Sequence, residues 1–175
     1  MPVSRLLVEG KLDAILLSAF LGGNPPVEPR GSKNSLKPIT AEEMSHEGPR
    51  VAFVRDRDFD FDPPLDEKVE LTEITDTRFP EPLGWYWSRH EIENYLLDPA
   101  IIQLVWPSVS RHDYESMLVK AAVKIRFYEA ARWAVGIARR ALPPHYELRT
   151  RPAELCDREL AVPAWFDMER CQQWA

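Results

Sequence analysis

The sequence has few cysteines and lacks a long hydrophobic run. Cys156 and Cys171 are too few for a four-ligand zinc site and have no CxxC spacing, so we interpret them as free thiols in a reducing cytoplasm. The longest apolar run, residues 14–21, is interrupted by Ser18. It is much shorter than the roughly 20 residues of a membrane span. The first residues also lack the apolar segment of a secretory signal.

Several catalytic motifs are missing from the sequence. It contains no Gly-x-x-x-x-Gly-Lys-Ser/Thr phosphate loop, so it encodes no ATPase of that type. It contains no Gly-x-Ser-x-Gly motif, which argues against a nucleophilic hydrolase. Its histidines are scattered; we interpret His90, the one beside the acidic residues discussed below, as a surface or capping residue.

The composition is that of a folded globular chain with an uneven charge distribution. At 175 residues and 45% hydrophobic content, we expect a substantial core. The net charge of −6 argues against a general nucleic-acid coat protein. Acidic residues dominate positions 1–110 and basic residues dominate 111–151. This division fits a metal site beside a phosphate-binding surface, and a solvated basic helix is the alternative.

Hydrophobic periodicity predicts alternating strands and helices. The expected strands cover 5–9, 27–28, 50–55, 68–74 and 83–88. The expected helices cover 13–21, 35–46, 91–97, a short segment from Asp98-Pro99, and 112–142, the last as one helix or a helical pair. Residues 59–67 are expected to form a loop, and 145–175 show no strong pattern. Such alternation predicts an α/β fold, a small parallel sheet flanked by helices with a helical C-terminal extension. We place the domains at 1–98 and 99–175.

Acidic residues follow three of the predicted strands. Glu9 ends the first, Asp56 and Asp58 end the strand at 50–55, and Glu91 and Glu93 follow the aromatic strand. Functional groups gather at the carboxyl ends of parallel strands, so these side chains are expected to converge. Clustered carboxylates favour a hard cation such as Mg²⁺ or Mn²⁺. Taken singly, each segment also fits a turn, a solvated loop or a helix start.

Three segments resemble a known domain. Residues 8–13, Val-Glu-Gly-Lys-Leu-Asp, resemble the first motif of the Toprim domain, and residues 54–58, Val-Arg-Asp-Arg-Asp, resemble its second. Residues 89–97, Arg-His-Glu-Ile-Glu-Asn-Tyr-Leu-Leu, are similar to the third segment of Toprim nucleases of the OLD (overcoming lysogenization defect) group, and of related anti-phage proteins whose Toprim domain accompanies an ABC-type ATPase. The third segment favours this branch over topoisomerases and primases.

The resemblance implies a role for each matching acid. Glu9 and Asp13 would serve one metal position, and Glu9 is also the candidate general acid or base. Asp56 and Asp58 would hold or bridge the ions, and Glu93 matches the acidic ligand of the third segment. All five are therefore candidate catalytic residues. A further metal candidate is Glu91, at a position where relatives often have serine.

Four basic residues are candidates for nucleic-acid contact. Residues 31–34, Gly-Ser-Lys-Asn, resemble the turn after the second Toprim strand, where Lys33 would touch a phosphate; a solvent-exposed lysine is the alternative. Lys120 and Lys124 are candidates, by position, for a downstream lysine used by OLD nucleases. Arg126 lies on the same basic segment and would contact the phosphate backbone, with a salt-bridged helix face as the alternative.

Tryptophans offer a second means of binding bases. Trp85, Trp87, Trp106 and Trp133 could stack on bases, but they lie in apolar periodic segments. We therefore expect them to pack in the core.

The expected function is a Mg²⁺- or Mn²⁺-dependent nuclease acting on DNA or RNA in bacterial anti-phage defence. One alternative is a latent or non-catalytic subunit that binds a separate ABC-type ATPase. Another is an RNA-processing Toprim protein. A homodimer is compatible with each of these.

Overall fold

The computed structural model describes residues 2–46, 50–62 and 71–141. The chain divides into two compact units, the first ending at Tyr95 and the second beginning at Leu96. The tail 145–175, with Cys156 and Cys171, lies outside the described residues.

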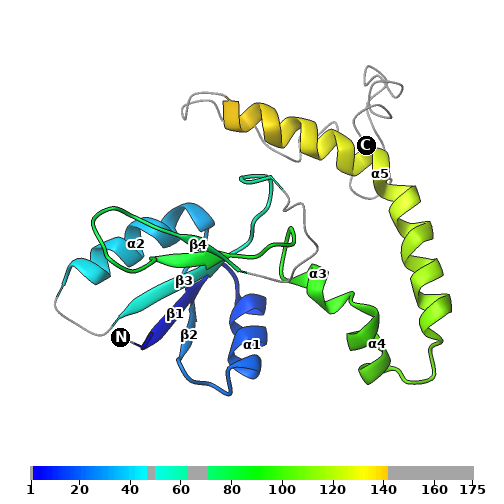
Figure 1. The fold of residues 1–175 in the computed structure, drawn as a ribbon, viewed down its shortest axis with the longest axis horizontal. Helices are drawn as coiled ribbons and strands as arrows, with labels where there is room; N and C mark the ends of the chain where they lie inside the picture. Colours follow the sequence, from blue (N-terminus) through cyan, green and yellow to red (C-terminus); the bar gives the residue numbers. More distant parts are fainter. Residues whose placement is uncertain (1, 47–49, 63–70, 142–175) are drawn as a thin grey trace. The chain divides into compact units, whose positions relative to one another are not determined.

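The first unit alternates strands and helices, as the sequence predicted (Figure 1). Its strands are β1 (Arg5–Val8), β2 (Val27–Pro29), β3 (Val51–Arg55), β4 (Thr72–Ile74) and β5 (Gly84–Tyr86). Its helices are α1 (Lys11–Phe20) and α2 (Lys33–Ser45), and the short α3 (Glu93–Leu96) lies at the boundary with the second unit. The expected strand at 83–88 is shorter than predicted, and the one at 68–74, whose first three positions lie outside the described residues, covers Thr72–Ile74 in the described part.

The strands of the described residues form one five-stranded sheet in the order β2-β1-β3-β5-β4. The β1–β2, β1–β3 and β3–β5 pairs are parallel, whereas β4 pairs antiparallel with β5 at the edge. The α/β class with flanking helices is therefore confirmed, and the expected parallel sheet is mostly parallel, with β4 as the antiparallel exception. No helix separates β4 from β5, and a short return connection joins neighbouring strands in antiparallel orientation.

The two faces of the sheet are covered by different helices (Figure 1). Leu6 and Val8 of β1 pack with Leu17 of α1 on one face. Leu7, between them in the strand, packs with Leu36 of α2 on the other face. Alternate side chains of a strand point to opposite faces, so a buried strand must be apolar at every position. The short run Leu-Leu-Val in β1 meets this requirement.

Gly84 in β5 lies where the sheet has no room for a side chain. A Cβ atom at this position would lie 2.3 Å from the carbonyl oxygen of Phe53 and 2.7 Å from its ring. Phe53 is fully buried and pairs with Gly84 across β3 and β5. Glycine is therefore required here by contact and not by an unusual dihedral angle.

The second unit contains two helices in its described part, α4 (Pro99–Val105) and α5 (Arg111–Ala141). Asp98 caps α4, because its Oδ1 accepts a 2.9 Å hydrogen bond from the backbone N–H of Ala100. The predicted helix start at Asp98-Pro99 is confirmed, and the long periodic segment forms one helix rather than a pair up to Ala141, where the described residues end. Among the described helices, none is both long and apolar enough to cross a membrane.

Candidate metal and phosphate site

The candidate site is built from the carboxyl ends of the four parallel strands. Glu9 directly follows β1, Asp56 follows β3, and Lys33 opens α2 after β2. The backbone N–H of Asp56 donates to Oε1 of Glu9 over 3.1 Å, and the N–H of Gly31 donates to the carbonyl of Glu9 over 3.1 Å. Hydrogen bonds therefore join three strand ends at Glu9.

The segment after β5 is fastened to the segment after β3. The backbone N–H of Asp58 donates to the carbonyl of His90 over 2.9 Å. The N–H of Ile92 donates to Oδ1 of Asp56 over 3.1 Å. These two bonds run in opposite directions between the segments, so the acidic residues 91 and 93 are held close to the Asp56-Arg57-Asp58 turn.

The buried Arg57 holds this turn in place through hydrogen bonds to two backbone carbonyls. Its side chain is 4% exposed, and its Nε donates to the carbonyl of Ser88 over 3.0 Å. Its Nη1 donates to the carbonyl of Phe61 over 2.8 Å. Because Arg57 points inward, Asp56 and Asp58 on either side are left to line the site. Asp58 has a φ of +48°, in the left-handed region that aspartate tolerates better than most residues.

Asp13 and Glu93 complete the acidic group. Oδ2 of Asp13 accepts a 2.7 Å hydrogen bond from the backbone N–H of Gly10, which also stabilises the start of α1. Burial raises the pKa of Asp13, and the charge of Glu93 raises it further against the opposing Gly10 hydrogen bond. Asp13 and Glu93 are therefore close enough to repel, although they lie 80 positions apart in the sequence.

Asp56 is the electrostatic centre of the group. Burial raises its pKa to about 8, and the charges of Asp13, Glu9 and Asp58 act in the same direction, while the Ile92 hydrogen bond opposes them. Burial likewise raises the pKa of Glu9. A raised pKa means that burial and neighbouring acids destabilise the ionised carboxylate, and a bound cation would stabilise it. An all-oxygen donor set of this kind suits Mg²⁺ or Mn²⁺.

A different part of the same edge already contains cations. Nζ of Lys33 lies 2.5 Å from Oδ2 of Asp58 and 2.9 Å from Oδ2 of Asp60, and Arg55 also pairs with Asp60. The side chain of Lys33 is 14% exposed. Burial raises the pKa of Asp60, but the hydrogen bonds and charges of Lys33 and Arg55 outweigh burial and hold it below its usual value.

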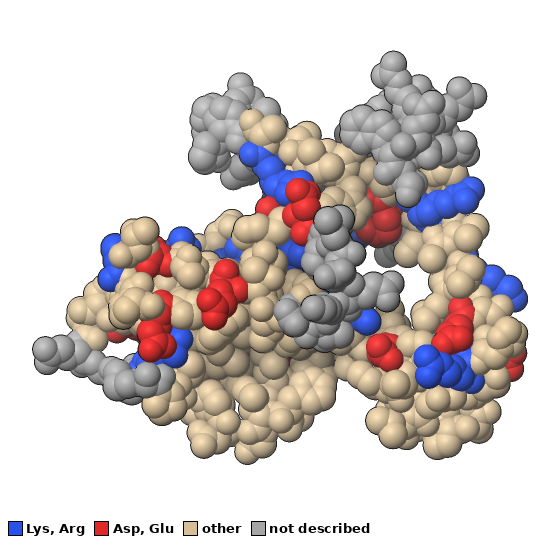
Figure 2. Space-filling model, viewed as in Figure 1, with Lys and Arg blue, Asp and Glu red and all other residues tan. Residues whose placement is uncertain are grey.

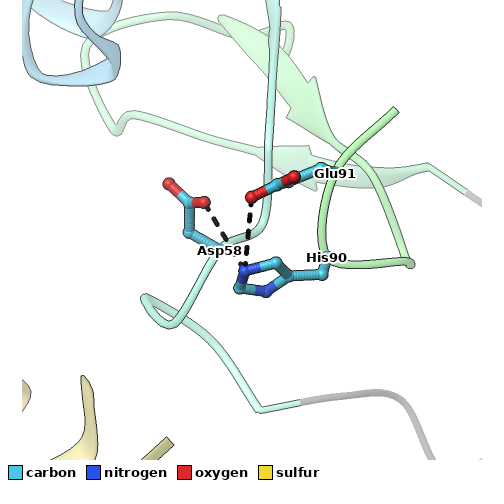
Figure 3. A group of neighbouring side chains, drawn as sticks. All are labelled: Asp58, His90 and Glu91. Carbon is cyan, nitrogen blue, oxygen red and sulfur yellow. Dashed lines mark ion pairs between the residues drawn. The ribbon is translucent and has the colours of Figure 1, made fainter. Parts of the chain in front are cut away.

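Asp58 also faces a histidine on its other side. Nε2 of His90 lies 3.9 Å from Oδ1 of Asp58 and 3.6 Å from Oε1 of Glu91, so both carboxylates approach the same ring nitrogen (Figure 3). Candidate ligand atoms of the three residues lie within 4.8 Å of one another. The ring of Phe59 packs against the imidazole at a centroid distance of 4.4 Å. His90 is thus part of the site, not a surface or capping residue.

Comparisons with known proteins identify no family. No family model matches the chain, and a search of curated proteins finds no match. The structure brings together all six acids singled out in the sequence: Glu9, Asp13, Asp56, Asp58, Glu91 and Glu93.

The remaining candidates for nucleic-acid contact lie in the second unit. Lys120, Lys124 and Arg126 are exposed on α5, and the guanidinium of Arg126 lies 4.5 Å from the ring centroid of Phe127. On the face of the molecule shown in Figure 2, acidic and basic side chains are interspersed. Phosphate contact by these three residues stays a prediction.

The tryptophans divide between core and surface. Trp85 and Trp87 pack against the cluster on the α1 face of the sheet, as expected for core residues. Trp106 is 57% exposed, so the expectation of core packing is wrong for it. It is the C-cap residue of α4 and follows Leu104 and Val105, which are exposed as well.

Sequence reasoning missed three contributors, namely His90, Asp60 and Arg57. The alternating acids at 56, 58, 60 and 62 were a usable signal for Asp60, and Arg57 stands between the first two of them. The pairing of Asp60 with Lys33 had no local signal, since the two residues are brought together by the parallel order of β2, β1 and β3.

Proposed function

We propose that this chain is a Toprim-like, Mg²⁺- or Mn²⁺-dependent nuclease that hydrolyses phosphodiester bonds in DNA or RNA. The observation that supports this most directly is the convergence of Asp56 with Glu9, Asp13 and Asp58 at one edge of the sheet, which together with burial raises the pKa of Asp56. Such a cluster is costly in the absence of a cation and is expected to bind one tightly. Its position at the carboxyl ends of parallel strands is the usual place for a site in this class of sheet.

The chain's own residues have distinct tasks in this proposal. Asp56, Asp13 and Glu93 would hold the ion, which supplies positive charge for the phosphate and for activation of water. Glu9 is suited to move a proton, because burial raises its pKa above the ordinary value of a glutamate and so makes the carboxylate a stronger base. Its Oε1 is oriented by the Asp56 N–H.

The Arg57 anchor and the two hydrogen bonds between the segments would keep these carboxyls in position. The carboxyl groups would thus be preorganised in the free protein, which limits the reorganisation needed during the reaction. The basic residues of α5 are proposed to hold the nucleic-acid backbone. A role in bacterial anti-phage defence is supported by the motif resemblance alone.

Cleavage assays test the proposal. We expect the protein to cut supercoiled plasmid or a structured RNA with Mn²⁺ or Mg²⁺ and not with EDTA. Glu9→Gln and Asp56→Asn should each reduce the rate by about 100-fold or more, while circular dichroism stays native. Glu73→Gln is the matched control, because Glu73 is an exposed carboxylate on β4.

Two outcomes would count against a nuclease. Undiminished cleavage in both site variants would place the activity elsewhere. Tight binding of Mn²⁺ without cleavage of either substrate would favour the latent subunit that acts with a separate ABC-type ATPase.

A further inference from the structure

The acidic edge described above has two parts with different charge balance. In the first, the charges of Glu9 and Asp13 act on Asp56 and that of Glu93 acts on Asp13, and the donors to Glu9, Asp13 and Asp56 are backbone N–H groups. In the second, Asp58 and Asp60 share the ammonium group of Lys33. From the sequence, Asp58 is a candidate metal ligand together with Asp56.

Lys33 is held in place by the fold and is not a loosely placed surface lysine. The N–H groups of Arg30 and Gly31 donate to the carbonyls of Val8 and Glu9 over 2.8 Å and 3.1 Å, which fixes the turn after β2 against the end of β1. Gly31 has a φ of +89°, and this turn directs the chain into α2, which begins at Lys33. The lysine side chain is 14% exposed.

The lysine also leaves little room for a divalent ion between the same two carboxylates. Its Nζ lies within 2.9 Å of an oxygen from each. An ion bound to those oxygens would stand against the ammonium charge, and like charges at such distances repel strongly inside a protein. Arg55 adds a second positive charge beside Asp60.

We propose that Lys33 is a positioning residue that replaces a second divalent ion, so that the chain binds one ion, at the Glu9, Asp13, Asp56 and Glu93 end of the site. This inference rests on the proposed metal-dependent function and specifies its ion count. It assigns Lys33 to Asp58 and Asp60 in place of a substrate phosphate. Asp58 then orients the lysine and His90, and does not ligate the ion.

The experiment counts Mn²⁺ ions by isothermal titration calorimetry and by electron paramagnetic resonance of bound Mn²⁺. We expect one ion per wild-type chain and two per Lys33→Met chain, because the variant leaves Asp58 and Asp60 without the ammonium group. Lys33→Arg should restore a count of one. Lys37→Met is the matched control, since Lys37 lies on the same helix, is 49% exposed and is 3.8 Å from Asp76, away from the site.

The ion counts distinguish this inference from the proposed function. Two ions in the wild type, or no additional ion in Lys33→Met, would overturn the role of Lys33 while leaving a metal site intact. No ion in the wild type would overturn both the proposed function and the count of one ion. If Lys33→Met fails to fold, Lys33→Gln, which retains the length and polarity of the side chain, is judged by the same counts.

Discussion

The backbone N–H of Ile92 donates a 3.1 Å hydrogen bond to Oδ1 of Asp56, which precedes it by 36 residues. This bond satisfies one oxygen of the most strongly perturbed carboxyl in the described chain and leaves its charge facing three other acids. Ile92 itself is buried in the core cluster on the α1 face of the sheet. The bond therefore joins the hydrophobic core directly to the candidate site.

Removing the charge of Asp56 should stabilise the metal-free protein. Asp56→Asn keeps an oxygen that accepts from Ile92 and removes repulsion from Asp13, Glu9 and Asp58. We expect a gain of about 1 kcal/mol at pH 8 in EDTA, which corresponds to a rise in Tm of roughly 2–4 °C for a chain of this size. Differential scanning calorimetry measures the change, with Glu73→Gln as the control. A lower Tm for Asp56→Asn would contradict electrostatic repulsion between Asp56 and its acidic neighbours.

Mn²⁺ should reverse the order of stability expected for wild type and Asp56→Asn in EDTA. Wild type should gain stability with Mn²⁺, by about 2.7 kcal/mol at a concentration of 100 times Kd, while Asp56→Asn should gain much less. The same calorimetric scans, repeated with Mn²⁺ in place of EDTA, give the comparison. Equal gains in the two proteins would mean that Asp56 does not take part in binding.

The stability of the metal-free wild type should depend on pH through Asp56. The folded state raises the pKa of this group from 3.8 to about 8, so between these values the folded chain holds a proton that the unfolded chain has released. This contribution to the free energy of unfolding is complete below about pH 3.8 and is lost as pH rises to 8.

Asp60 changes the free energy of unfolding in the opposite direction with pH, because Lys33 and Arg55 outweigh burial and lower its pKa. The diagnostic quantity is therefore the difference between wild type and Asp56→Asn, measured by urea unfolding at several pH values in EDTA. The wild type should lose stability relative to the variant from pH 5 to pH 8. A difference that is constant with pH would remove the support for a raised pKa at Asp56.

Arg57 should matter for metal binding without touching metal. Arg57→Met removes the hydrogen bonds to the carbonyls of Ser88 and Phe61 and leaves both without this donor. We expect a loss of about 1–3 kcal/mol in stability and a 10- to 100-fold weaker affinity for Mn²⁺ because the acids lose their support. Arg78→Met, at a 64% exposed arginine paired with Asp76, should change neither quantity appreciably.

Gly84→Ala tests the packing that positions β5. Its added methyl group would overlap the carbonyl and ring of Phe53, so the strands must separate. We expect a loss of about 1–3 kcal/mol or more in urea unfolding. Gly22→Ala is the comparison, since Gly22 has a φ of +62° and open space around it, and its cost should be about 1 kcal/mol from backbone conformation alone. A smaller loss for Gly84→Ala than for Gly22→Ala would contradict the close approach.

The order of strands and helices could be predicted from the sequence, because hydrophobic periodicity is local. Leu-Leu-Val before Glu9 and Val-Ala-Phe-Val before Arg55 are apolar at every position, as strands covered on both faces must be. The same local pattern placed Glu9 and Asp56 at strand ends, and parallel pairing then brought them to one edge. The direction of β4 had no such signal, since it depends on the return path of the chain through residues 75–83.

The sequence by itself determined which acids stand at strand ends, and the tertiary structure alone decided the partner of each. Asp56 faces other carboxyls and has a raised pKa, whereas Asp60, four residues later, is paired with Lys33 and Arg55 and has a lowered one. Electrostatic energy changes steeply over a few ångströms, and those distances arise from contacts between segments far apart in the chain. Residue spacing does not contain them, so the charge balance of the site follows from the packing of β2, β1, β3 and β5.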